Sequence, residues 1–140
     1  MTKAEIKVET PPSESRLAEL HENLASAGQM LRDDELKTFL LSVSAADGNM
    51  AAGCKGEIAF RSAHVSALWV DENQRGQGLG GRLLASAEDY AREQGCDRIH
   101  LETRNESARR LYERLGYDVF GALPDYEGTN TLYYLTKNIG

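Results

Sequence analysis

The chain has 140 residues and a mass of 15.5 kDa, a length that corresponds to about one domain with a core of its own. Its 16 Lys and Arg against 22 Asp and Glu give a net charge of −6, which argues against nucleic acid and membrane surfaces as partners, because both are bound through clustered basic side chains. The sequence contains neither an apolar membrane-spanning stretch nor the apolar segment of a secretory signal. Cys54 and Cys96 match no metal-ligand spacing, so we expect free thiols and no metal. These features predict a single cytoplasmic domain over residues 1–140.

The first half of the chain has the pattern of one helix among several strands. Leu17, Leu20 and Leu24 repeat at the spacing of one helical face, and Gly28 is a natural end for this helix. Runs with strand character lie on both sides of the helix, and turn residues separate them. The expected strands are 4–9, 36–45, 53–60 and 64–70. The last three follow one another closely, which favours antiparallel pairing.

After residue 70 the spacing of apolar residues becomes that of helices. The segments 79–91 and 108–115 both carry an apolar stripe of this kind. Between them, RIHLET at 98–103 is typical of a short buried strand, which a crossover helix would place parallel to the strand 64–70. The closing strands are expected at 117–121 and 131–136. This order predicts an α/β (α+β) domain in which helices flank a mixed central sheet of about six to seven strands.

The glycine-rich stretch RGQGLGG at 75–81 fits two kinds of pyrophosphate site. Taken from Gly76 it is G-x-G-x-x-G, the fingerprint of nicotinamide-dependent oxidoreductases, and Glu102 follows about twenty residues later, as an acid for the ribose would. Taken from Arg75 it is R-x-x-G-x-G, in which backbone N–H groups at a helix start and a guanidinium hold the phosphates. Two observations count against the first interpretation. Residues 71–75 separate the strand from the glycines, and the strands upstream look like hairpins.

A second motif, NESARRLYERLGY, follows at residues 105–117. Together the two stretches resemble the GNAT superfamily of N-acetyltransferases. In that superfamily R/Q-x-x-G-x-G/A binds the coenzyme A pyrophosphate, and N-x-x-A-x-x-L-Y-x-x-x-G-F/Y covers the pantetheine. The matching residues are Arg75, Gly78 and Gly80 in the first motif and Asn105, Ala108, Leu111, Tyr112, Gly116 and Tyr117 in the second. The resemblance covers about residues 60–120 and implies the GNAT fold, acetyl-CoA as the donor and direct acetyl transfer to a primary amine.

The resemblance also implies where the site lies. It places a splay, with a bulge, between the strands 64–70 and 98–102. Backbone groups of Leu68–Val70 would bind the pantetheine, and the N–H of Leu68 or Val70 would stabilise the oxyanion. Tyr112 would be the general acid for the departing thiolate. The residues expected to bind the cofactor are Leu68, Trp69, Val70, Arg75, Gly76, Gln77, Gly78, Leu79, Gly80, Gly81 and Asn105.

Two residues are candidates for the general base that deprotonates the amine. Glu102 ends its strand beside the splay, in an L-E-x-R context like that of ribosomal-protein acetyltransferases of this superfamily. His64 lies near the position of a glutamate in histone-type members, and simple alternation places it on the face of Leu68 and Val70. The same alternation puts Trp69 on the other face, where we expect core packing. We favour Glu102 as the base.

The acceptor is left open as a small amine or polyamine, an antibiotic amino group, an amino acid, or a protein amino group. Asp125, Tyr126 and Glu127, expected in a loop, would suit a cationic amine. The resemblance leaves a homodimer open, since members are often dimers. The alternatives are the oxidoreductase and a non-catalytic acyl-CoA-binding module. Tyr112 argues against the module, because a binder needs no proton donor there.

Overall fold

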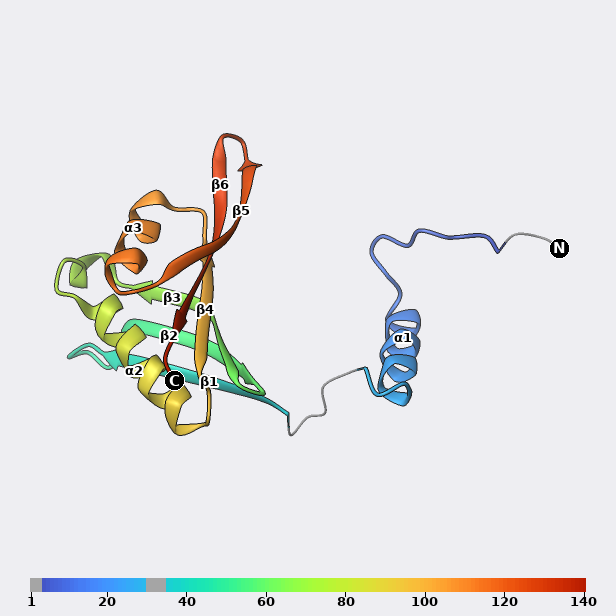
Figure 1. Cartoon of the computed structure of the whole chain (residues 1–140), viewed down its shortest axis with the longest axis horizontal. Coiled ribbons are helices and arrows are strands. Elements are labelled where there is room, and N and C mark those ends of the chain that lie inside the picture. The colour runs from blue at the N-terminus through green and yellow to red at the C-terminus, as the bar shows by residue number, and fades with distance from the viewer. Residues whose placement is uncertain (1–3, 30–34) are drawn as a thin grey trace. The chain divides into compact units, whose positions relative to one another are not determined.

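The structure is a computed structural model, and it describes residues 4–29 and 35–140 (Figure 1). The chain divides into two compact units, Met1–Asp34 and Glu35–Gly140, which are described one at a time. The single domain expected over residues 1–140 stays a prediction. No helix in the described part of the chain is both long and apolar enough to cross a membrane.

The first unit contains one described helix, α1, at Glu14–Ser26. Ser13 caps the helix, since its hydroxyl accepts a hydrogen bond from the backbone N–H of Arg16. The strand expected at 4–9 is wrong. Apolar and charged residues alternate there, but no described strand pairs with them, and Ile6 and Val8 are 93% and 87% exposed.

The second unit is built on a mixed sheet of six strands (Figure 1). Their order across the sheet is β1-β2-β3-β4-β6-β5, and neighbours are antiparallel except for the parallel pair β3–β4. The strands are β1 Leu36–Ser44, β2 Met50–Ala59, β3 Ser62–Val70, β4 Arg98–Thr103, β5 Asp118–Glu127 and β6 Asn130–Asn138. The predicted fold class and the antiparallel pairing of the early strands are confirmed.

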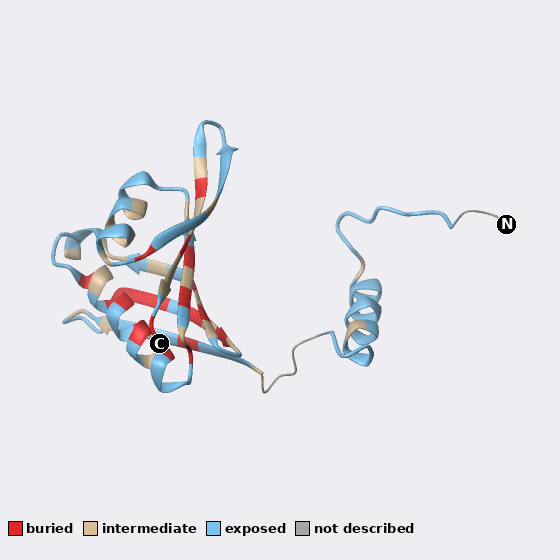
Figure 2. Ribbon diagram, in the orientation of Figure 1, coloured by how far each residue is buried: buried red, intermediate tan, exposed pale blue. Residues whose placement is uncertain are grey.

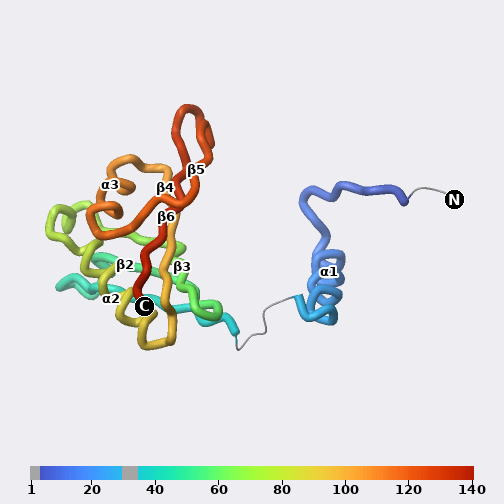
Figure 3. Tube along the Cα trace, in the orientation of Figure 1, coloured from blue at the N-terminus to red at the C-terminus, as the bar shows by residue number. Residues whose placement is uncertain are grey.

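Two helices form the crossovers around the central strands. The helix α2 (Leu79–Glu93) connects β3 to β4, as the trace in Figure 3 shows, and α3 (Glu106–Arg114) follows β4. The helix α2 packs against β1, β2 and β3, and α3 packs against β4 and β5. Figure 2 shows buried residues along the middle strands and on one side of α2. The largest fully buried side chains are Tyr117, Leu84, Ile99, Leu135 and Cys54.

The strand β5 is longer than the sequence pattern indicated. The segment after residue 121 was expected to be a loop, but β5 continues to Glu127 and pairs with β6 through register shifts after Val119 and Leu123. Because β5 is an edge strand, Pro124 can lie in it without removing a hydrogen bond from the interior of the sheet.

The strands β3 and β4 separate soon after they begin to pair. Their parallel pairing covers Ser62–His64 of β3, opposite 98–100 of β4. From there β3 continues to Val70 and β4 to Thr103 with no pairing between them. This is the predicted splay, and it leaves one edge of β3 free for another partner.

A bulge in β3 changes which side chains share a face. Val65 is opposite Gly56 and Ala67 is opposite Lys55, so Ser66 has no partner on β2. The extra residue shifts the alternation by one, and Leu68 and Val70 pack against the core while His64 lies on the other face. The expectation that His64 shares a face with Leu68 and Val70 is therefore wrong.

Candidate active site

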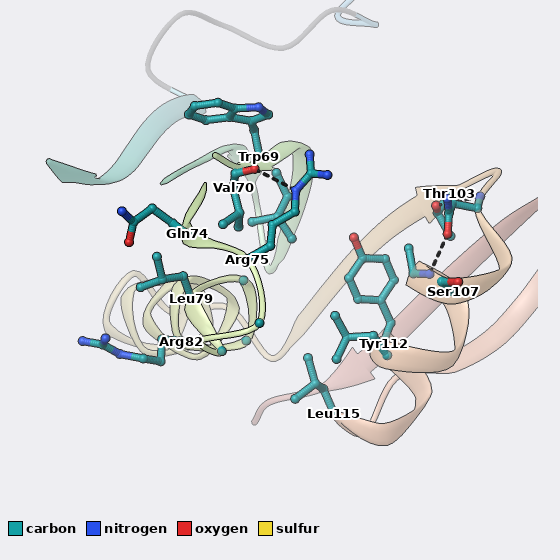
Figure 4. Close-up of a pocket in the computed structure, with 18 of the residues that line it drawn as sticks. Trp69, Val70, Gln74, Arg75, Leu79, Arg82, Thr103, Ser107, Tyr112 and Leu115 are labelled. Carbon is teal, nitrogen blue, oxygen red and sulfur yellow. Dashed lines mark hydrogen bonds between the residues drawn. The ribbon is translucent and has the colours of Figure 1, made fainter. Parts of the chain in front are cut away.

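A cavity of about 1070 Å³ lies between the end of β3, the glycine loop, the start of α2 and the inner side of α3 (Figure 4). Most of the residues expected to bind the cofactor line this cavity. They are Leu68, Trp69, Val70, Arg75, Gly76, Gly78, Leu79, Gly80, Gly81 and Asn105, together with the expected acid Tyr112. Gln77 and Glu102 are not among the lining residues.

The glycine loop is shaped as a cradle for anions. Gly76 and Gly78 have φ angles of 81° and 76°, in the left-handed region that favours glycine. Gly78 is also the N-cap residue of α2 and has no side chain to bond the first N–H groups of the helix. These donors, with the positive end of the helix dipole, suit a phosphate. The backbone here therefore fits a pyrophosphate.

Two guanidinium groups flank the cradle. Arg75 donates from Nε to the backbone carbonyl of Val70 over 3.2 Å, which fixes its side chain beside the end of β3 (Figure 4). Arg82, in the first turn of α2, also lines the cavity. Neither forms an ion pair with another described residue. Our sequence interpretation missed Arg82, although a basic residue in a first helical turn without acidic residues was a usable signal.

Asn105 begins α3 and thereby orients the residues that follow. Its Oδ1 accepts a hydrogen bond of 2.9 Å from the backbone N–H of Ala108, so its side chain is the N-cap of the helix. This capping turns Tyr112 and Leu115 toward the cavity (Figure 4). Asn105 lines the cavity, and its side chain is engaged in capping the N-terminus of α3.

Tyr112 has the environment of a proton donor. Burial, and then the neighbouring Cys54, raise the pKa of its phenol above the ordinary value of a tyrosine. Within the described residues its hydroxyl makes no hydrogen bond, so it is available to a ligand. A phenol that stays protonated near neutral pH can donate its proton to the sulfur of a departing thiolate.

Glu102 lies on the other face of the sheet. Along β4, Ile99 and Leu101 are buried in the core, and the alternation directs His100 and Glu102 to the opposite side. The Glu102 carboxylate is hydrogen-bonded to Nε2 of His64, at 3.0 Å from Oε1 and 2.9 Å from Oε2. The two candidate bases are therefore in direct contact.

Other groups hold the His64 ring in place. It stacks on His100 with the ring centroids 4.8 Å apart and the planes 12° apart. Its Nδ1 is 3.9 Å from Oε2 of Glu57 on β2. Burial, followed by the charge of His64, lowers the pKa of His100. Within the described residues, no cluster of three or more His, Cys, Asp and Glu side chains could hold a metal ion.

The His64–Glu102 pair borders a second cavity, of about 610 Å³. Adjacent residues of β4 line the two cavities, because Glu102 faces the second one and Thr103 faces the first. The expected acid and base are thus on opposite faces of the sheet, beside the unpaired parts of β3 and β4. A donor from one side and an acceptor from the other would meet at this splay.

Comparison with known proteins agrees with this geometry. The acetyltransferase (GNAT) family model matches residues 4–117. This chain belongs to the GNAT family of acetyltransferases. It is 41% identical to a blasticidin-S acetyltransferase of Streptomyces morookaense over 93 residues, which are 66% of this chain and 68% of that protein.

Other acetyltransferases extend the match over more of the chain. An acetyltransferase of Agrobacterium fabrum is 33% identical over 115 residues, or 82% of this chain and 81% of that protein. An acetyltransferase of Bacillus cereus, known from its crystal structure, shares the fold with a TM-score of 0.82 at 24% identity, over 96% of this chain and 97% of the other. The protein is therefore an acyltransferase, a GNAT N-acetyltransferase, as the sequence motifs predicted.

The oxidoreductase interpretation of the glycines is not supported by the GNAT fold. The strands before the glycines are antiparallel, and the short 3-10 helix Glu72–Gln74 lies between β3 and the loop. A dinucleotide fold would have βαβ units there and a tight turn directly after the strand. Glu102, the acid proposed for a ribose, lines the cavity on the other side of the sheet.

The sequence interpretation was also wrong about Trp69. Core packing was expected, but Trp69 is 48% exposed and its indole points away from Leu79 and Tyr112 (Figure 4). It alternates with Leu68 and Val70, which pack against the core, and so faces away from it.

Proposed function

We propose that this GNAT acetyltransferase transfers the acetyl group of acetyl-CoA directly to a primary amine that enters through the cavity beside Glu102. The observation that carries the proposal is the pair of cavities that approach each other at the splay. One has an anion cradle and the proton donor Tyr112, and the other has the Glu102–His64 pair. Direct transfer needs this arrangement, because donor and acceptor must be held together.

The donor cavity suits the pyrophosphate and the pantetheine of coenzyme A. The glycine loop with Arg75 and Arg82 would hold the pyrophosphate. The backbone groups of Leu68–Val70 that face the splay have no strand partner, so they can pair with the amides of the pantetheine. One of these N–H groups would then stabilise the oxyanion of the tetrahedral intermediate.

The residues around the splay have distinct roles in the proposed reaction. Acetyl-CoA supplies the thioester carbonyl that the neutral amine attacks, so that a C–N bond forms and the C–S bond breaks. Glu102 accepts the proton that the amine loses. Tyr112 gives its proton to the departing sulfur. The proton taken by Glu102 is later released to water, and Tyr112 is reprotonated from solvent.

The proposal is tested by incubating the protein with acetyl-CoA and a panel of primary amines. Release of free thiol is followed, and mass spectrometry identifies the acetylated product. Blasticidin S belongs in the panel because of the related blasticidin-S acetyltransferase. The Tyr112→Phe variant is the control for spontaneous acetylation. Binding of acetyl-CoA without thiol release for any amine would point to the non-catalytic module instead.

The chemistry of the chain supports a proposal for its cellular setting. The buried free thiols Cys54 and Cys96 suit a reducing compartment, which supports a cytoplasmic location. The net charge of −6 supports a function without nucleic acid or a membrane surface as partner. A homodimer is a separate hypothesis, and light scattering after size-exclusion chromatography tests it.

A further inference from the structure

The second cavity has the chemistry to select one class of amine. We propose that the acceptor is a monoamine with a flat, apolar body one or two carbons away from the nitrogen, and that Phe120 and Tyr134 bind this body. The inference rests on the proposed function, because it takes the second cavity as the place where the acceptor enters. Polyamines and amino acids are the competing classes.

The apolar wall of the cavity consists of side chains from the β5–β6 hairpin. The rings of Phe120 and Tyr134 are 6.1 Å apart between centroids and tilted by 54°. Leu132 is buried on the same face, and Tyr126 lies further along β5. Phe120 is 61% exposed, so its ring presents apolar surface that a bound ligand would cover. Tilted aromatic rings at this separation form a good contact surface for another ring.

The position of the carboxylate limits the distance between the amine and the apolar body. Glu102 on β4 is directly opposite Tyr134 on β6 in the antiparallel ladder. Side chains at such positions lie next to each other, with Cβ atoms about 5 Å apart. An amine that reaches Glu102 therefore has its next few atoms against the Tyr134 ring. A short linker between nitrogen and ring fits this spacing.

The charges in the cavity favour a single amino group. Among the described residues that line it, Glu102 is the one carboxylate, and it also bonds His64. Arg104 also lines the cavity and is paired with Glu127. A second ammonium group of a polyamine would meet no free carboxylate there and would approach a cation. The carboxylate of an amino acid would have to compete with Glu127 for Arg104.

The test compares kcat/KM for four probes with the unmodified protein: phenethylamine, ethylamine, spermidine and phenylalanine. We expect phenethylamine to exceed each of the others by about tenfold or more, since apolar contacts of this size commonly discriminate by such factors. Equal values for phenethylamine and ethylamine, or a preference for spermidine or phenylalanine, would overturn the inference. Acetylation of these other amines would still support the proposed function. Absence of acetylation with every amine would overturn both.

Matched variants test whether Phe120 and Tyr134 cause the preference for phenethylamine. Phe120→Ala and Tyr134→Ala should raise KM for phenethylamine about tenfold and lower kcat/KM for ethylamine by a clearly smaller factor. Phe60→Ala is the control, because Phe60 is 69% exposed and lines neither cavity. Unchanged acetyl-CoA affinity shows that the variants are folded. Equal losses for both amines in the Phe120 and Tyr134 variants would show that these rings do not bind the acceptor's body.

Discussion

The His64 imidazole and the Glu102 carboxylate form one hydrogen-bonded pair, with Nε2 of His64 2.9 Å from Oε2 and 3.0 Å from Oε1 of Glu102. The two residues come from β3 and β4, and His64 is the last residue of β3 that pairs with β4. Since Nε2 is engaged by Glu102 and Nδ1 faces Glu57, the imidazole has no ring nitrogen directed at an acceptor. This contact supports Glu102 as the proposed base, and we propose that His64 orients it.

Replacing the base should remove the pH dependence that it causes. Glu102→Gln keeps an oxygen that accepts from His64, so the site should stay ordered while the amide cannot take a proton. We expect kcat/KM near neutral pH to fall by about 10²–10⁴-fold and the acidic limb of its pH profile to flatten. Steady-state rates measured between acidic and alkaline pH test this. An active variant with an unchanged profile would show that another group is the base.

Replacing His64 should have a smaller and different effect. His64→Leu removes the hydrogen bond that orients the Glu102 carboxylate, so kcat/KM should fall by less than in Glu102→Gln and the acidic limb should persist. His64→Gln retains an N–H donor and should restore part of the lost kcat/KM. The comparison of the two variants is the control for loss of packing. If the limb vanishes in both variants and persists in Glu102→Gln, His64 is the base.

Tyr112→Phe should separate binding from turnover. The phenyl ring keeps the contacts of Tyr112, so acetyl-CoA affinity and the thermal midpoint should hardly change, while kcat falls by about 10²–10⁴-fold. Because burial raises the pKa of Tyr112, the phenol stays protonated into the alkaline range. Activity that depends on it should be lost only as pH rises through this raised pKa, and the variant should lack that alkaline limb. Turnover within a few-fold of the original would assign Tyr112 to packing alone.

Gly80 is the cleanest position for testing the pyrophosphate cradle. A side chain at Gly78 would be strained by the left-handed φ of 76°, whereas a Cβ at Gly80 would meet Val70 Cγ2 at an ordinary 3.8 Å. Gly80→Leu should therefore fold, and its side chain should displace the phosphates. We expect loss of acetyl-CoA binding by calorimetry, with unchanged affinity in the control Ser86→Leu on the exposed side of α2. Retained acetyl-CoA affinity in folded Gly80→Leu would refute the hypothesis that the glycine loop binds the pyrophosphate. Saturable binding of NADH to the unmodified protein would support the oxidoreductase interpretation again.

Features set by local sequence were predictable, and features set by strand register were not. The glycine loop, α2 and the start of α3 depend on residues close together in the chain, such as Gly78 and Asn105. The bulge at Ser66 depends on how β3 pairs with β2, and it reversed the face expected for His64. The contact between His64 and Glu102 depends on the β3–β4 register, which no local pattern reveals.

A buried ion pair joins α2 to the last strand and to the end of α3. Glu88 is only 6% exposed. Its carboxylate accepts hydrogen bonds from Lys137 Nζ over 2.8 Å and from the Tyr117 hydroxyl over 3.0 Å. Lys137 also donates to the backbone carbonyl of Leu115. Lys137→Met leaves the buried carboxylate without its cation, so we expect a loss of about 3 kcal/mol in the free energy of unfolding, measured with urea. The double variant Glu88→Leu with Lys137→Met removes both charges and should recover most of this loss.

Arg61→Met, which breaks the exposed pair with Asp97, is the control and should cost about 1 kcal/mol or less. If the double variant is as unstable as the sum of its single variants, the two charges do not act as a pair.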